Sequence, residues 1–231
     1  MNSASDLFLH EQILLLALRD KEGTIGFDVD WQHPIAGAIV AELLLNKRVR
    51  VDGSKRRKPV TVVDFTPLGD PIIDECLEKI KKMRIQPSIE ALVSKFSDVR
   101  KLKHRLAQQL CRKGILKADE DTVLGLFKRK IYPEINPEPE RKLIEQMREA
   151  IFTDKDDIDS RTVVLISLAQ SAGLLTMVFD KKELKQRKGR IKQLINGEIV
   201  GKATKEAIEA MHAAVAIACF VPIMAATAVN H

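Results

Sequence analysis

The segment Ile35–Asn46, IAGAIVAELLLN, constrains the fold most, because it contains a single charged residue. Its length and composition are typical of a helix that has no polar side to turn toward water. Such a helix has to be enclosed by other elements, so the chain must supply several helices around it. With 231 residues, 45% of them hydrophobic, the chain can bury this core in one unit. We therefore expect a single domain that spans residues 1–231.

Most of the remaining chain also shows helical periodicity. Leu7–Leu18 is an amphipathic pattern that is followed by a turn at Gly23, and Pro71–Met83 begins after Asp70 with Pro at its first position. Further helices are expected at Ser88–Phe96, Val99–Arg112, Arg141–Phe152, Arg161–Phe179, Lys181–Ile195 and from Lys202 onward.

Two parts of the chain have the pattern of β-hairpins. Arg48–Asp52 and Val60–Phe65 are short, Val-rich segments separated by the basic connection GSKRRKP. Ile115–Asp119 and Val123–Tyr132 form the second expected pair of strands, with the turn at Glu120–Thr122. The expected fold class is therefore mainly α: a single-domain helical bundle ringed by amphipathic helices, with two β-hairpins.

The segment Ala210–Val229 contains no Asp, Glu, Lys or Arg. About 20 apolar residues are enough to cross a bilayer. The segment is dominated by Ala, however, and it contains His212 and Pro222. We expect a buried core helix here rather than a membrane span.

The cysteines Cys76, Cys111 and Cys219 lie far apart, with no CxxC pair and no neighbouring histidine ligand. This usage is typical of a reduced, intracellular protein and not of a disulfide framework or a zinc site. The short polar stretch Met1–Asp6 does not fit a secretory signal. We expect a cytoplasmic location.

Known catalytic motifs are missing from the sequence. It contains no GxxxxGK[ST] or GxGxxG loop, no GxSxG turn and no HExxH pair, and its five histidines share no ligand spacing. Paired carboxylates such as Asp74 and Glu78 lie among Lys and Arg, as on a solvated helix face. We expect neither an enzyme nor a cofactor or metal ion.

Basic clusters are the positive functional signal. The formal net charge of +6 favours acidic partners such as nucleic acid or anionic lipid headgroups. In the expected helix Val99–Arg112, Arg100 and Lys103 are three residues apart and so project from one side, where two cations can grip one phosphate group. Another basic cluster, at residues 181–192, is most simply a solvated face.

A second candidate feature is the sequence VLGLF, which contains Leu124, Leu126 and Phe127 and precedes Lys128–Lys130. Apolar residues beside cations suit a hairpin tip that enters lipid while the cations meet headgroups. The alternative is an ordinary hairpin that packs its apolar side on the core. The sequence leaves both interpretations open.

Two other functions fit part of the pattern. A winged helix that binds nucleic acid would combine a helix, a hairpin and the basic tip at residues 55–58, but its recognition helix should present polar and basic residues. Ile35–Asn46 is almost wholly apolar, so we expect no nucleic-acid binding. A protein-interaction scaffold without specific lipid binding fits the sequence as well as membrane binding does.

Taken in order, several segments resemble the Golgi phosphoprotein 3 family. The matching stretches are LLLALRDKEG at Leu14–Gly23, RLAQQLCRKGIL at Arg105–Leu116, RKLIEQMREAIF at Arg141–Phe152, SRTVVLISLAQSAGLL at Ser160–Leu175 and RIKQLI at Arg190–Ile195. The resemblance implies a helical bundle that binds phosphatidylinositol 4-phosphate on the cytosolic face of Golgi membranes. In eukaryotes it also implies a trafficking adaptor that retains glycosyltransferases by their cytosolic tails and links them to coat proteins.

The resemblance also implies a headgroup pocket. Two arginines of the family fall on Arg100 and Lys103, and its tryptophan falls on Phe27, with Trp31 a turn away as a substitute. Its arginine on the second helix falls on Ala36, which removes a phosphate contact worth roughly 1.5–3 kcal/mol. The ligand expected from this set is an anionic membrane lipid.

The segment Leu124–Phe127 matches the family's membrane-inserting and self-associating hairpin, which implies a homo-oligomer formed through it. Only Met1–Ser5 precede the first expected helix, where the family has a longer tail. We therefore expect a short or prokaryotic member, with a generic anionic lipid as ligand.

Overall fold

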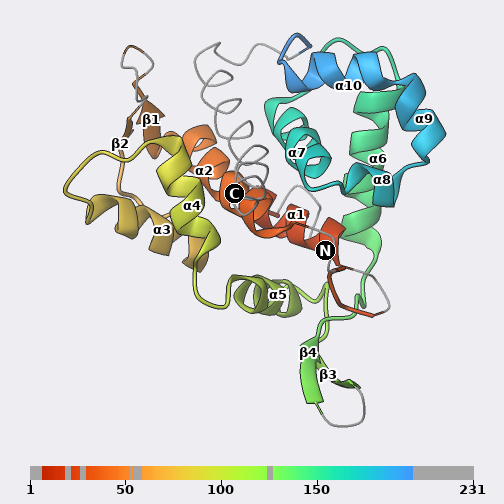
Figure 1. The fold of residues 1–231 in the computed structure, drawn as a ribbon, viewed down its shortest axis with the longest axis horizontal. Coiled ribbons are helices and arrows are strands. Elements are labelled where there is room, and N and C mark those ends of the chain that lie inside the picture. The colour runs from red at the N-terminus through yellow and green to blue at the C-terminus, as the bar shows by residue number, and fades with distance from the viewer. Residues whose placement is uncertain are drawn as a thin grey trace, which may run out of the picture.

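The computed structural model describes residues 7–18, 22–26, 30–52, 54, 59–123 and 127–199. Within these residues the chain is mainly helical, with two small antiparallel sheets of two strands each, so the expected fold class is confirmed (Figure 1). The helices are α1 (Leu9–Ala17), α2 (Gln32–Leu45), α3 (Pro71–Lys81), α4 (Ile89–Ser97), α5 (Leu102–Arg112), α6 (Glu138–Phe152), α7 (Ser160–Ser171), α8 (Leu175–Val178), α9 (Lys181–Gln186) and α10 (Lys188–Ile195). The strands are β1 (Val49–Val51), β2 (Val60–Val62), β3 (Asp119–Val123) and β4 (Phe127–Ile131).

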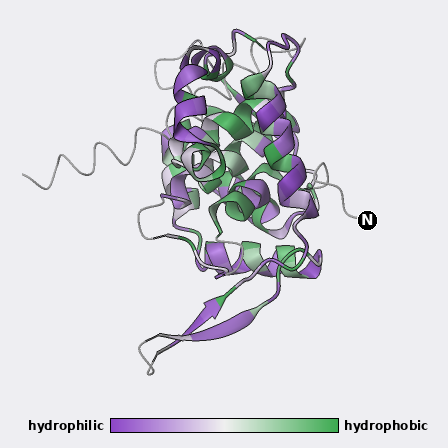
Figure 2. Ribbon diagram, turned by 90° about the vertical axis from the view of Figure 1, so that its right-hand side faces the viewer, coloured by the Kyte–Doolittle hydropathy of each residue, from purple (hydrophilic) through white to green (hydrophobic). Residues whose placement is uncertain are grey.

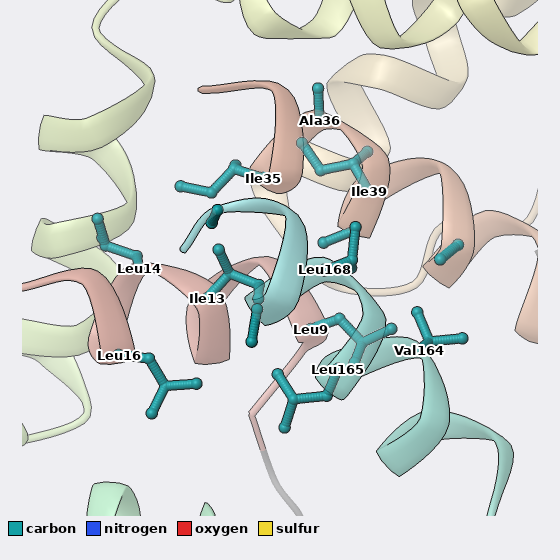
Figure 3. Packing of buried hydrophobic residues seen from close by; sticks show 14 of the residues in the cluster. Leu9, Ile13, Leu14, Leu16, Ile35, Ala36, Ile39, Val164, Leu165 and Leu168 are labelled. Carbon is teal, nitrogen blue, oxygen red and sulfur yellow. The ribbon is translucent and has the colours of Figure 1, made fainter. Parts of the chain in front are cut away.

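Helices α1, α2 and α7 form the centre of the hydrophobic core. Leu9 of α1, Ile39 of α2 and Leu168 of α7 belong to one buried cluster (Figure 3). The predicted burial of the apolar α2 is confirmed, because α2 is buried from Pro34 to Leu44. Figure 2 shows hydrophobic segments in the interior, and hydrophilic segments around it and along the β3–β4 hairpin. A central position leaves α2 no face with which to read nucleic acid.

Helix α1 is not the amphipathic helix that its sequence predicts, since all of its residues are buried. Its polar residues are tied to neighbouring helices instead of facing water. Glu11 accepts hydrogen bonds from the backbone N–H of Phe8 (3.0 Å) and from Nζ of Lys113 at the end of α5 (2.6 Å). His10 lies 3.3 Å from Asp70, which caps the start of α3 and accepts a hydrogen bond from Gln109 of α5. Buried polar contacts therefore fix α5 against α1.

A buried ion pair joins α2 to α7. Glu42 of α2 has no exposed surface, and its two carboxylate oxygens accept from Arg161 of α7 at 2.6 and 3.0 Å. The same carboxylate accepts from the backbone N–H of Leu9 (2.7 Å) and from the amide of Asn46 (3.1 Å). Since both oxygens are used, the charge of Glu42 is compensated inside the core.

Two predicted helices are interrupted. The helix expected at Arg161–Phe179 ends at Ser171, because Gly173 adopts a left-handed conformation with φ +72°, and the short α8 follows. The helix expected at Lys181–Ile195 divides at Arg187, which leaves helical geometry with ψ 12° and separates α9 from α10.

The β3–β4 hairpin projects from the helical body beyond α5 (Figure 1). The expected turn at Glu120–Thr122 is wrong, because these residues belong to β3 and pair with β4. Val123 pairs with Phe127, so residues 124–126 connect the strands. The acidic residues of β3 and the basic residues of β4 stand opposite each other, and this cross-strand complementarity favours the observed register.

The predicted helix at Ala210–Val229 and Cys219 lie outside the described residues. Within the described ranges, no helix is both long enough and apolar enough to span a membrane. The expectation of one domain over residues 1–231 also covers residues that are not described, and it stays a prediction.

Candidate functional site

Arg100 does not lie on the helix that was expected to carry it. Helix α5 begins at Leu102, because Lys101 adopts a left-handed conformation (φ 56°, ψ 31°) that interrupts the helical path. Arg100 is therefore in the turn between α4 and α5, and both Arg100 and Lys101 are exposed. The argument from helical spacing of Arg100 and Lys103 was wrong, although both residues lie at the same end of α5.

The first turn of α5 has no side-chain cap among the described residues. Backbone N–H groups at a helix start lack intrahelical partners and carry the positive end of the helix dipole. Here they lie next to Arg100 and Lys101, so side-chain charge and backbone dipole have the same sign.

Basic side chains of α5 and β4 gather near this end of the helix. Burial lowers the pKa of the half-buried Lys103, and the charge of Arg129 lowers it further. Burial also lowers the pKa of His104, followed by the charges of Lys103, Lys130 and Lys101. These five side chains, which we call the α5–β4 cluster, therefore lie within electrostatic reach of one another.

Most cations of the α5–β4 cluster make no salt bridge with a described residue. Arg129 pairs with Asp121 on the facing strand at 2.7 Å. In the described part of the chain, Lys101, Lys103 and Lys130 make no salt bridge. Like charges held together raise the local potential, and a bound anion would relieve their repulsion.

Tyr132 anchors the base of the hairpin behind this cluster. Its hydroxyl lies 3.1 Å from Nδ1 of His104, and its backbone N–H donates to the carbonyl of Gly23 at 2.9 Å. Gly23 has φ +58°, and a Cβ there would lie 2.3 Å from the backbone nitrogen of Pro133. On the arm of the hairpin that leads into β3, the N–H of Lys117 donates to the carbonyl of Pro133 at 2.9 Å. The hairpin base, α5 and the α1–α2 connection therefore meet at Tyr132.

Of the two aromatic candidates, the structure describes Trp31, and its described interactions do not join it to this cluster. Trp31 is half-buried at the start of α2, where it packs against the hydrophobic core. Among the interactions of the described residues, none joins Trp31 to Arg100 or Lys103. Phe27 lies outside the described residues.

Ala36, the position implied for a further headgroup arginine, belongs to the core. It is fully buried beside Ile35 and Ile39 (Figure 3). A side chain at this position offers no surface to a ligand in this chain.

The hairpin candidates are described only in part. Leu124 and Leu126 lie outside the described residues, and of Phe127 only the backbone pairing with Val123 is described. Insertion of this segment into lipid stays a prediction, and so does self-association through it.

The sequence did not predict the contacts of Tyr132 with His104 and Gly23. The basic residues of α5 and β4 are visible as two runs in the sequence, but nothing in the sequence shows that the runs converge. Arg105, which belongs to the first run, instead pairs with Glu75 of α3 at 2.6 Å. Within the described residues, no group of acidic, Cys and His side chains could hold a metal ion.

These features define a helical protein with a cation-rich surface at the base of a projecting hairpin. The sequence model of the Golgi phosphoprotein 3 (GPP34) family matches residues 9–211, and the chain belongs to this family. A curated relative, vacuolar protein sorting-associated protein 74 of Eremothecium gossypii, is 30% identical over 131 residues. The match covers 49% of this chain and 40% of that relative, so less than half of the relative's length is represented.

Proposed function

We propose that this protein is a peripheral membrane protein that binds a phosphorylated anionic lipid headgroup and catalyses no reaction. Phosphatidylinositol 4-phosphate is the headgroup to which the family resemblance points. The ligand would be held by Arg100 and by Lys103 of the α5–β4 cluster, assisted by the other basic side chains of that cluster. The observation that carries the proposal is this cluster, whose Lys101, Lys103 and Lys130 make no salt bridge with a described residue.

The chemistry of the site matches a phosphate group. Arg offers a planar pair of donors and Lys a compact charge, and hydrogen bonds with charged groups are about twice as strong as neutral ones. Half-burial of Lys103 strengthens its interaction with an anion, because less water screens it. With Ala36 in the core, the site depends on α5 and β4 for its positive charge.

Vesicle flotation tests the proposal. The protein is mixed at physiological salt with neutral vesicles, vesicles with phosphatidylserine, and vesicles with phosphatidylinositol 4-phosphate at matched charge. The Arg100→Ala/Lys103→Ala variant should lose at least about tenfold in affinity for anionic vesicles, because each charged contact contributes roughly 1.5–3 kcal/mol.

The matched control is Lys188→Ala/Lys192→Ala, which removes the same charge from exposed positions of α10 at the opposite end of the molecule from the β3–β4 hairpin (Figure 1). This control should bind as the wild type does. Equal losses in the two variants would mean that binding follows net charge alone. No flotation of the wild type with any anionic vesicle would favour the scaffold function instead.

We also propose a role in membrane trafficking at the Golgi, as the names of the family and of its relative suggest. Cytosolic tails of membrane proteins are then the protein partners to test. Pull-down by such tails immobilised on vesicles, with and without the Arg100→Ala/Lys103→Ala change, separates lipid binding from tail binding.

A further inference from the structure

Exposed apolar side chains gather on the β2–α3–α4 part of the molecule. Ile85, in the connection between α3 and α4, is 77% exposed, and Val63 and Phe65, which follow β2, are 50% and 46% exposed. Single exposed apolar residues are common, but several close together mark an interaction site. Together with their basic neighbours they form what we call the α3–α4 surface: Val63, Phe65, Lys81, Lys82, Arg84 and Ile85.

Contacts between the segments that carry these residues bring the segments together. The Nζ atom of Lys81, at the end of α3, lies 5.0 Å from the centre of the Phe65 ring. The backbone N–H of Val60 in β2 donates to the carbonyl of Pro87 at 2.8 Å, and Pro59 forms an antiparallel bridge with Ser88. The α3–α4 connection that carries Ile85 therefore runs beside β2, and the end of α3 lies beside the segment that follows β2.

The charge of this surface is positive. Lys81 is paired with Glu78 at 3.5 Å, and Asp64 is compensated by Arg48 at 2.7 Å. Lys82 and Arg84 are exposed, and neither makes a salt bridge with a described residue. Apolar side chains that project among unpaired cations are complementary to an anionic lipid surface, which accepts both at once.

We propose that the α3–α4 surface is a second membrane contact, in which Ile85 and Phe65 enter the headgroup region of an anionic bilayer while Lys82 and Arg84 meet lipid phosphates. The isoleucine projects from the α3–α4 connection. A fluid lipid surface can accept such a side chain, because lipid needs no preformed pocket to enclose it. In Figure 1, the α3–α4 connection lies at the left of the molecule and the β3–β4 hairpin at its lower right, so the proposed contact is separate from the α5–β4 cluster. The inference rests on the proposed membrane binding but uses different residues.

Two tryptophan variants test the contact directly. Ile85→Trp adds a fluorophore to the surface, and Met177→Trp adds one to α8, where the replaced side chain is 48% exposed. Vesicles of phosphatidylcholine and phosphatidylserine with brominated acyl chains quench only rings that reach the lipid. The added fluorescence of Ile85→Trp should shift to the blue and be quenched, whereas that of Met177→Trp should not change. The native Trp31 contributes the same background to both variants.

Flotation gives the energetic test. Ile85→Asn/Phe65→Asn should bind anionic vesicles about tenfold more weakly than the wild type, since two apolar side chains no longer enter the bilayer. Met177→Asn is the matched control and should bind normally. Circular dichroism should show unchanged helicity, because both replaced side chains are exposed.

The outcomes separate this inference from the proposed function. If the wild type floats, but the Trp at position 85 is not quenched or Ile85→Asn/Phe65→Asn binds as the wild type does, the α3–α4 surface is no membrane contact. If these variants behave as expected while Arg100→Ala/Lys103→Ala still binds fully, the contact stands and the headgroup site fails. A wild type that binds no anionic vesicle overturns both.

Discussion

Replacing Arg161 by Met should destabilise the protein strongly, although Arg161 is not one of the proposed binding residues. The change leaves Glu42 with no exposed surface and no opposing charge, while Leu9 and Asn46 still donate to it. Removing one partner of a buried pair costs about 3–5 kcal/mol. The side chain of Arg161 is 39% exposed, so water reaches the pair, and we expect a lower loss of about 2–3 kcal/mol.

For a chain of this size, 1 kcal/mol corresponds to roughly 2–4 °C in Tm, so Tm should fall by about 5–10 °C. Thermal unfolding is followed by circular dichroism at fixed pH and salt. The control Arg141→Met breaks the exposed pair with Glu138 on α6 and should leave Tm unchanged. The Glu42→Gln/Arg161→Met double variant should lose less than the sum of its single changes. A Tm for Arg161→Met equal to that of the control would refute the reasoning.

Two further predictions concern Gly23 and His104, the two contacts of Tyr132 at the base of the hairpin. Gly23→Ala should cost about 2 kcal/mol more than Gly114→Ala in urea unfolding, because both glycines have positive φ but only at Gly23 would a Cβ collide with backbone. Equal losses would mean that the α1–α2 connection does not contact the hairpin base. Burial and neighbouring cations lower the pKa of His104 from the ordinary 6.5. His104 is therefore neutral at pH 7.4, and it gains its positive charge only as the pH falls below 6.5. Affinity for phosphatidylserine vesicles should rise from pH 7.4 to 5.5 in the wild type, and a His104→Gln variant with the same rise would contradict this role.

Local signals predicted most elements of the fold. The apolar pattern of α2 predicted its burial, and Asp70 followed by Pro71 predicted the start of α3. The break at Gly173 was missed although a glycine in this position is a common helix end, because apolar periodicity continues beyond it. For α1, the amphipathic pattern of Leu7–Leu18 predicted a solvated side, whereas its buried Glu11 accepts from Lys113, 102 residues further on.

The candidate site was predictable in its chemistry but not in its geometry. The run of cations at the start of α5 is plain in the sequence, yet the left-handed Lys101 moves Arg100 off the helix. Such a conformation is uncommon for a residue other than Gly, so no local pattern announces it. The convergence of α5 with β4 depends on Tyr132, whose partners lie 28 residues away in His104 and still further away in Gly23. Contacts over this distance come from packing and not from sequence periodicity.

The attachment of the hairpin has a mechanical consequence. The bond of Lys117 to Pro133 and the bridge between Leu116 and Glu134 join the two arms of the hairpin below its paired strands. Tyr132 ties these joined arms to the helical body, through its backbone bond to Gly23 and its hydroxyl contact with His104, so the hairpin cannot change its angle to the body without breaking these contacts. The hairpin therefore keeps one orientation relative to the helical body. Its angle to any surface on which the protein rests also sets the angle of the whole body to that surface.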